Sequence, residues 1–341
     1  MGWKVVNTRE IPSTDFAYEL LAAFDATLVK GVWLTEEEII AQATDADAVI
    51  GVVSQQPFNR RVLSALERCR VVAGIGIGYD TVDVEAATEL GIAITNVPDY
   101  CLDEVSGLAI TLILALGHKL FKIDRAVREG TISFTMDKSA LDRIAFPRFR
   151  MRNQTVGIVG LGKIGTATAL KARGLGMSVV AYDPYVLGPV MESRGVTPVD
   201  FDTLLKESDY VTVHTPLTYE TRNMFGFEQF KSMKRSSYFI NTARGGCVEQ
   251  GALVRALEEE LIAGAGIDVT VDEPMAPDNP LRRMSNVIVT GHSAFYSIPS
   301  EIDLYRRPMT QIVQALQGVM PTYTVNPEVK ARWMERWSAR T

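Results

Sequence analysis

The sequence has few cysteines, few histidines and no excess of positive charge, and each shortage excludes a class of function. Its three cysteines, Cys69, Cys101 and Cys247, lie far apart without a C-x-x-C pair. We therefore predict free thiols, a reducing cytoplasmic location, no cysteine-bound zinc and no other metal site. A net charge of -6 without a basic tail argues against nucleic-acid partners, because neutralising phosphates needs clustered Lys and Arg.

Long apolar runs are also missing. The most apolar stretch, GLAITLILALGHKL, is too short to cross a bilayer and is typical of a buried helix. The beginning, MGWKVVNTREI, lacks the charged region and apolar core of a signal peptide, so we expect no membrane partner. With 341 residues, 47% hydrophobic and 22% charged, the chain is long enough for two domains with separate cores.

The most informative stretch runs from Thr155 to Asp183. An apolar run enters a glycine turn, a helical pattern follows, and a second apolar run ends on a carboxylate. This order is that of a strand, a turn, a helix and a strand, and its glycines, Gly160, Gly162 and Gly165, form G-x-G-x-x-G. A lone G-x-G-x-x-G is weak, but here its surroundings agree with it, so the stretch predicts a dinucleotide-binding fingerprint.

Physical chemistry assigns each part of this fingerprint a role. Gly160 permits the tight turn, Gly162 lets the backbone approach a pyrophosphate, and Gly165 lets the helix pack on the strand. The amides of Lys163 and Ile164 would face the phosphates at the positive end of the helix. Asp183 would bind the ribose hydroxyls and repel a 2′-phosphate, which favours NAD (NADH) over NADP. The alternative is an ordinary strand-end aspartate.

The rest of the chain alternates short β-like runs with helical runs, which predicts parallel sheets covered by helices. Thr35 and Ser13 are expected helix caps. A long helix is expected over Asp103–Glu129, followed by an irregular charged stretch, and a last helix over Pro299–Gln317. We predict an α/β protein with a substrate-binding domain made of residues 1–102 and 299–341, and a nucleotide-binding domain at 103–298. The last helix would return to the first domain.

Three polar residues follow predicted strands, where ligands bind in parallel sheets: Arg244, Glu273 and His292. An arginine matches a substrate carboxylate, a histidine moves protons near neutral pH, and a glutamate can hold the imidazole. Each alone is more often an ordinary surface or strand-end residue. Of the other histidines, we expect His118 to be structural and His214 to lie beside the nucleotide.

Several motifs, in this order, resemble the D-isomer-specific 2-hydroxyacid dehydrogenases. The matching segments are GIGYDTVD, NVPDYCLDEV, VGIVGLGKIG, AYDP, HTPLTYETRNMF, NTARGGCVEQGAL, GIDVTVDEP and TGHSAFYS. Within the family, the aromatic HSAFYS segment and the VNPEV tail are similar to the C-terminal-binding-protein corepressors. The resemblance implies two doubly wound, Rossmann-like domains with an interdomain cleft, and a homodimer built on the nucleotide domains.

The resemblance also implies roles for individual residues. Arg244 would orient the carboxylate of a 2-oxo or 2-hydroxy acid, and His292, paired with Glu273, would be the general acid/base. The remaining assignments concern contacts with ligands: the carboxylate would also be held by the amides of Ile77 and Gly78, the adenosine would lie beside Thr215, Pro216 and Thr221, and the nicotinamide would lie among Thr242, Ala243 and Asp268.

The chain departs from the family pattern at Gly74, where members often have a basic residue, and at Gly291, where a proline is common. Aromatic residues that could line the cleft favour a medium or bulky 2-oxo acid over glyoxylate, although ordinary packing explains them equally well. Two other functions stay open. One is an NAD(H)-sensing corepressor or scaffold, and the other is a dehydrogenase for a non-carbon acid such as phosphite, or for formate.

Overall fold

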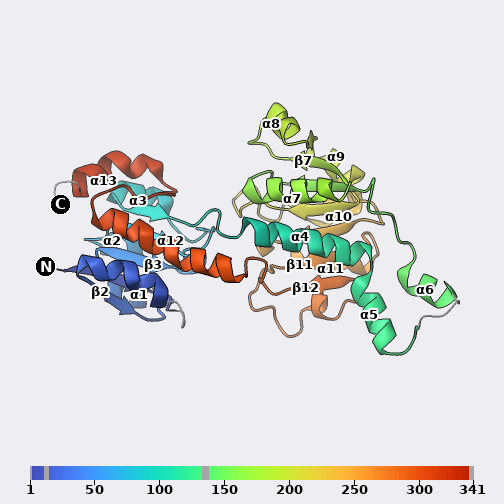
Figure 1. Cartoon of the computed structure of the whole chain (residues 1–341), viewed down its shortest axis with the longest axis horizontal. Helices are drawn as coiled ribbons and strands as arrows, with labels where there is room; N and C mark the ends of the chain where they lie inside the picture. The colour runs from blue at the N-terminus through green and yellow to red at the C-terminus, as the bar shows by residue number, and fades with distance from the viewer. Residues whose placement is uncertain (1, 11–14, 133–137, 338–341) are drawn as a thin grey trace. The chain divides into compact units, whose positions relative to one another are not determined.

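The computed structural model describes residues 2–10, 15–132 and 138–337, which form two compact units (Figure 1). The smaller unit combines Met1–Tyr100 with Ser297–Thr341, and the larger is Cys101–Tyr296. Each is built on one sheet whose paired strands are all parallel. The predicted fold class, α/β with two doubly wound units, is therefore confirmed.

The smaller unit has a five-stranded sheet in the order β2-β1-β3-β4-β5. Its strands are β1 (Trp3–Asn7), β2 (Ala26–Lys30), β3 (Ala48–Gly51), β4 (Val71–Gly74) and β5 (Ala93–Thr95). Its helices are η1 (Asp15–Phe24), α1 (Glu36–Ala43), α2 (Arg60–Ala65), α3 (Val84–Leu90), α12 (Ile298–Leu316), η4 (Pro327–Val329) and α13 (Lys330–Trp337). Apolar side chains of α1, α2 and α3 pack on the sheet in one cluster, and α12 packs on β3 and β4.

Local capping accounts for two of these helices. Thr35 accepts a hydrogen bond from Glu38 N and Glu38 accepts one from Thr35 N, so the predicted cap Thr35 is confirmed and forms a capping box at the start of α1. Ser297 caps α12 in the same reciprocal way with Ser300, and Gly318 follows that helix in the left-handed conformation. The expected cap Ser13 lies outside the described residues.

The larger unit has a seven-stranded sheet in the order β12-β11-β10-β9-β6-β7-β8. Its strands are β6 (Thr155–Val159), β7 (Ser178–Tyr182), β8 (Thr197–Pro198), β9 (Tyr210–Val213), β10 (Tyr238–Asn241), β11 (Gly264–Ile267) and β12 (Val287–Val289). The strand order reverses between β6 and β9, and β6 is the strand that enters the glycine turn. Ligands of doubly wound sheets bind at such a reversal point.

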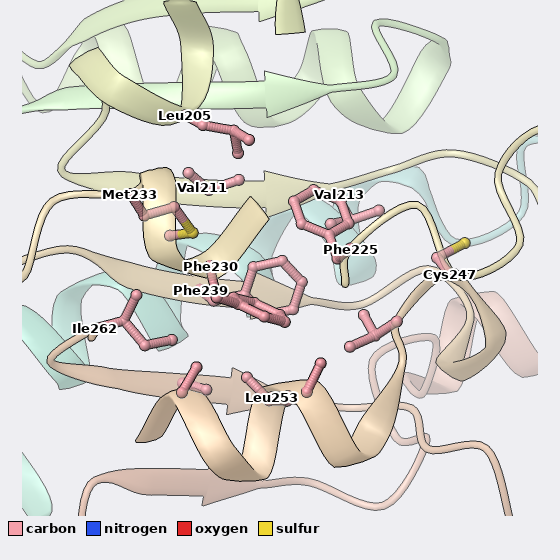
Figure 2. Packing of buried hydrophobic residues seen from close by; sticks show 14 of the residues in the cluster. Leu205, Val211, Val213, Phe225, Phe230, Met233, Phe239, Cys247, Leu253 and Ile262 are labelled. Atoms are coloured by element: carbon pink, nitrogen blue, oxygen red, sulfur yellow. The ribbon is translucent and has the colours of Figure 1, made fainter. Parts of the chain in front are cut away.

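Two apolar clusters lie against this sheet. One joins it to α4 (Leu102–Gly117) and α7 (Lys163–Gly174), and the other to α9 (Phe201–Glu207), α10 (Phe227–Ser232) and α11 (Gln250–Glu258). Figure 2 shows the second cluster, in which the rings of Phe230 and Phe239 meet edge to face with centroids 5.2 Å apart. Such burial on both faces gives the site loops at the strand ends a rigid base.

The predicted single helix over Asp103–Glu129 is wrong. The chain bends by 58° between α4 and α5 (Leu120–Arg128), because Lys119 adopts a left-handed conformation with φ 55°. Most of α4 is buried, whereas only Ala126 of α5 is, so α5 leaves the core. Among the described residues no single helix is long and apolar enough to span a membrane, and α4 with α5 passes that test only as a bent pair.

Four short helices were not expected from the sequence. They are α6 (Lys138–Ala145), which lies in the stretch expected to be irregular, α8 (Gly188–Ser193), α9 and α13. Each is only six to eight residues long, too short for apolar periodicity to be distinguished from chance. Part of the irregular stretch, residues 133–137, lies outside the described residues.

Candidate active site

Arg244, Glu273 and His292 lie after the carboxyl ends of β10, β11 and β12, three neighbouring strands of the larger unit. His292 Nδ1 is 2.7 Å from Glu273 Oε2, so the two side chains form a hydrogen-bonded pair. The charge of Arg244 acts on the pKa of both partners. The structure therefore brings the three predicted residues into one neighbourhood, with His292 Nε2 as the ring nitrogen left for a ligand.

The pair shifts the pKa of each partner. The hydrogen bond that His292 Nδ1 donates to Glu273 raises the pKa of His292 above its ordinary value, although burial and Arg244 oppose this. Burial alone would raise the pKa of Glu273, but the bond and charge of His292, the Thr270 N–H and Arg244 together lower it. The two shifts therefore both favour the charged forms, a carboxylate on Glu273 beside an imidazolium on His292.

A buried carboxylate holds the loop that carries His292. Asp268, 2% exposed, accepts hydrogen bonds from Thr290 Oγ1 at 2.5 Å, Ser293 N at 2.9 Å and Ala294 N at 3.2 Å. His292 N also donates to the Asp268 carbonyl at 2.5 Å. Gly291 and His292 both have positive φ, 64° and 56°, a rare conformation for histidine. Gly291 thus allows the turn, and Asp268 restricts it.

The Arg244 turn is shaped by its own neighbours. Asn241, 1% exposed, accepts from Ala243 N at 3.0 Å and donates to the Arg244 carbonyl at 2.9 Å. A Cβ on Gly245 would lie 2.1 Å from the Thr270 backbone, so only glycine lets this turn pack on the loop leading to Glu273. Sequence reasoning assigned no role to Asn241 or Gly245, although both stand in the NTARGG motif.

The glycine turn after β6 has the space that a diphosphate needs. Gly160 has φ 92°, and a Cβ there would come within 2.9 Å of the His214 backbone. A Cβ on Gly165 would lie 2.1 Å from the Gly160 carbonyl, whereas one on Gly162 would meet nothing within 4 Å. The capping residue, Gly162, makes no side-chain hydrogen bond to the N-terminus of α7, whose first turn contains Lys163 and Ile164. The turn therefore fits a dinucleotide pyrophosphate.

Asp183 follows β7 and is partly buried. Its carboxylate accepts from Leu161 N at 2.8 Å and from Tyr185 N at 2.9 Å, which ties the strand end to the glycine turn. A carboxylate accepts about four hydrogen bonds, so positions for two ribose hydroxyls remain. Arg194, the residue after α8, donates to the Leu161 carbonyl and to Thr166 Oγ1, each at 2.8 Å, a support that no sequence motif indicated.

Two enclosed polar atoms lie at the ends of neighbouring strands. His214 Nδ1, after β9, and Thr242 Oγ1, after β10, have no hydrogen-bond partner within the described residues. Burial lowers the pKa of His214 to about 4, so its ring is neutral at physiological pH. Buried polar groups rarely stay unpaired, and both atoms suit a bound nucleotide. In the following loop Thr221 Oγ1 donates to the Pro216 carbonyl at 2.6 Å and accepts from Thr218 N at 2.8 Å.

The other predicted residues are divided between the two units. Ile77 and Gly78 follow β4 in the smaller unit, whereas in the larger unit Ala243 lies in the Arg244 turn and Thr215 directly follows His214 after β9. His118 is the capping residue after α4, and its Nδ1 lies 2.5 Å from Arg148. Gly74 ends β4, where a Cβ would lie 2.7 Å from the Thr95 carbonyl. A larger residue at position 74 would thus displace β5.

The fold is that of nucleotide-dependent dehydrogenases, and comparison with known proteins agrees. Residues 110–294 match the family model for the NAD-binding domain of D-isomer specific 2-hydroxyacid dehydrogenases. The chain is 35% identical over 331 residues to the glyoxylate reductase of Korarchaeum cryptofilum, covering 96% of each protein.

Solved structures extend the similarity to the whole fold. A glyoxylate reductase from Paecilomyes thermophila superposes with a TM-score of 0.83 at 26% identity, covering 96% of this chain and 99% of that one. The D-mandelate dehydrogenase of Rhodotorula graminis has a TM-score of 0.83 at 27% identity, covering 95% and 98%. The chain therefore belongs to the D-isomer specific 2-hydroxyacid dehydrogenase family and is an NAD-dependent oxidoreductase acting on CH–OH groups.

Proposed function

We propose that the protein reduces a 2-oxo acid to the D-2-hydroxy acid with NADH and a proton, yielding NAD, and that Arg244, Glu273 and His292 are its catalytic residues. The single observation that carries the proposal is the 2.7 Å bond between His292 and Glu273 beside Arg244. The smaller unit would bind the substrate and the larger would bind the cofactor.

Bound NADH supplies the hydride that reduces the 2-oxo carbon. His292 donates its Nε2 proton to the ketone oxygen, because Nδ1 is occupied by Glu273. Glu273 stabilises the imidazolium before the transfer, and its raising of the histidine pKa favours reduction near neutral pH. In the oxidation direction, neutral His292 accepts the hydroxyl proton at the same atom. Arg244 orients the carboxylate through its planar guanidinium, together with the amides of Ile77 and Gly78.

The cofactor contacts are proposed on the geometry of the larger unit. The pyrophosphate would lie on Gly160–Gly165, with the ribose on Asp183. Adenosine would lie beside Thr215, Pro216 and Thr221, and the enclosed Nδ1 of His214 suits a polar group there. The nicotinamide would lie near Thr242, Ala243 and Asp268, where Thr242 Oγ1 has no protein partner among the described residues.

His292→Ala tests the assignment directly. Loss of the proton donor should reduce turnover by at least about 10²- to 10⁴-fold, while the dissociation constant of NADH stays nearly unchanged. NADH oxidation is followed with glyoxylate, pyruvate and phenylglyoxylate, and NADH binding by fluorescence titration. His118→Ala is the matched control, because this histidine is bonded to Arg148 outside the site. Retained turnover in His292→Ala would refute the mechanism.

The same three 2-oxo acids, compared by their turnover, show which size of substrate the enzyme prefers. The Phe295 ring meets the His292 ring edge to face with centroids 6.3 Å apart, which supports a medium or bulky apolar substituent on the 2-oxo acid. We therefore expect phenylglyoxylate or pyruvate to be preferred over glyoxylate, although the relatives named above include glyoxylate reductases. A preference for glyoxylate would refute this part of the proposal.

A second candidate function is an NAD(H)-sensing scaffold like the C-terminal-binding-protein corepressors. Its support is the aromatic segment around Tyr296, which is 62% exposed and suits a partner surface. Tight NADH binding without turnover of any 2-oxo acid would favour it. We further propose a cytoplasmic location, supported by the three cysteines, which are all buried and form no disulfide within the described residues.

We also propose that the protein is a homodimer joined through the α5–α6 surface of the larger unit. Large apolar side chains are exposed there: Leu120, Phe121, Val127, Leu141, Phe146 and Phe149. One of them, Phe121, lines a groove of about 660 Å³ formed by residues of α4, α5, α6 and β12. Phe121→Asp should convert a dimer of the 37.6 kDa chain to monomer in light scattering, whereas Leu187→Asp, also exposed, should not. A monomeric wild type would refute this proposal.

A further inference from the structure

The loop that carries Ile77 and Gly78 is held by the segment that follows β5. Asn96 Nδ2 donates to the Ile77 carbonyl at 2.8 Å, and Val97 N donates to the Gly76 carbonyl at 2.8 Å. Two successive peptide groups are therefore anchored by their oxygens on one side. All of these residues belong to the smaller unit.

Peptide geometry decides where the nitrogens of those groups point. In a trans peptide the N–H lies opposite the C=O, and the cis bonds of the described chain are elsewhere, at Phe146–Pro147 and Glu273–Pro274. The N–H groups of Ile77 and Gly78 must therefore point away from Asn96 and Val97. Neither has a hydrogen-bond partner within the described residues, and both residues are partly exposed. Two adjacent amides with this orientation form a site for an anionic oxygen.

Asn96 is held in turn by a buried glutamine of α12. Gln311, 1% exposed, donates from Nε2 to the Asn96 carbonyl at 2.8 Å and accepts from Thr95 Oγ1 at 2.6 Å. One helical turn earlier, Arg307 pairs with Asp99, so α12 is bonded to the same segment at a second point. A buried amide is costly unless paired, and a methionine would fill this volume without that cost. The presence of a glutamine at position 311 therefore indicates that its hydrogen bonds are needed to hold its partners in position.

We propose that Asn96 and Gln311 are positioning residues that hold the Ile77 and Gly78 amides in the orientation that receives the substrate carboxylate. The inference rests on the proposed function for the identity of the anion. Gln311 holds the Asn96 backbone, Asn96 holds the Ile77 carbonyl, and the Val97 amide holds the Gly76 carbonyl. Neither side chain touches the substrate in this scheme, so both act only through the loop.

The test uses Gln311→Met, which conserves volume, and Asn96→Ala, in the full chain. Gln317→Met, at the residue directly after the same helix, is the control, because its side chain is exposed. Hydrogen exchange over residues 75–80 should accelerate roughly 10-fold in both variants but not in the control. The KM for the best 2-oxo acid should rise roughly 10-fold with a much smaller change in kcat. NADH affinity should not change, because the cofactor contacts proposed above lie in the larger unit.

Unchanged exchange in both variants, or faster exchange with unchanged KM, overturns the inference. If the wild type turns over no 2-oxo acid, the proposed function fails, and oxalate binding measured by calorimetry replaces KM as the readout for the carboxylate site. Weaker oxalate binding in the variants whose loop exchanges faster then supports the positioning role. Equal oxalate binding in the variants and the wild type overturns it.

Discussion

Glu273→Gln removes the negative charge from the pair that Glu273 forms with His292, while the side chain keeps its shape. Glutamine can still accept from Thr270 N through Oε1, but it no longer offers a carboxylate to His292 Nδ1. The pKa of His292 should then fall, because the first cause of its elevation is lost. Since reduction needs protonated His292, the alkaline limb of its pH profile should move to lower pH. Oxidation, which needs the neutral ring, should extend to lower pH.

The size of the effect follows from the exposure of the pair. Hydrogen bonds to charged groups contribute about 1.5–3 kcal/mol, equivalent to about 10- to 150-fold. The side chains of His292 and Glu273 are 41% and 33% exposed, so solvent screens them and the lower end applies. We expect reduction at pH 8 to fall about 10-fold and to recover toward the wild-type rate at acidic pH.

The assay is NADH oxidation between pH 5 and pH 9 at saturating 2-oxo acid. Asp272→Asn is the matched control, because it removes the adjacent, exposed carboxylate without touching the pair. An unchanged pH profile in Glu273→Gln, or an equal loss of activity at every pH, would show that Glu273 does not act through the protonation of His292.

Two further substitutions test the larger unit. Asp183→Ala should narrow the preference for NAD over NADP by removing the repulsion of a 2′-phosphate. The ratio of the two affinities is the measurement, because lost bonds to Leu161 and Tyr185 would weaken both cofactors alike, and an unchanged ratio contradicts this role. Asp268→Asn should lower kcat at least about 10-fold, because an amide nitrogen cannot accept from the loop of His292. If NADH affinity falls as far as kcat, Asp268 acts mainly on the nicotinamide instead.

Much of the local structure could be predicted because its causes are local. The capping box at Thr35 and the glycines of the central turn act over a few residues, so their patterns appear in the sequence. The prediction of a single helix over Asp103–Glu129 was wrong because the position of the helix break depends on where the hydrophobic core ends. Lys119 turns the chain at the point where burial stops, whereas the nearest glycine, Gly117, is the last residue of α4 and does not carry the left-handed conformation.

Supporting contacts between distant residues could not be predicted. Asn96 meets Ile77, and Gln311 meets Asn96, across separations that no motif spans. The same is true of Asp268, which sequence reasoning placed beside the nicotinamide and whose carboxylate holds the loop of His292. These contacts arise only when parallel strands and α12 bring remote segments together.

The sequence by itself determined the fold class, the dinucleotide fingerprint and the three residues proposed for catalysis, because periodicity, glycine turns and polar residues at strand ends have short-range physical causes. Only the tertiary structure decided which groups support them: Asp268 beneath His292, Asn241 within the Arg244 turn and Asn96 behind Ile77. A buried amide or carboxylate acts through partners far away in the chain, so its role depends on how the sheets assemble.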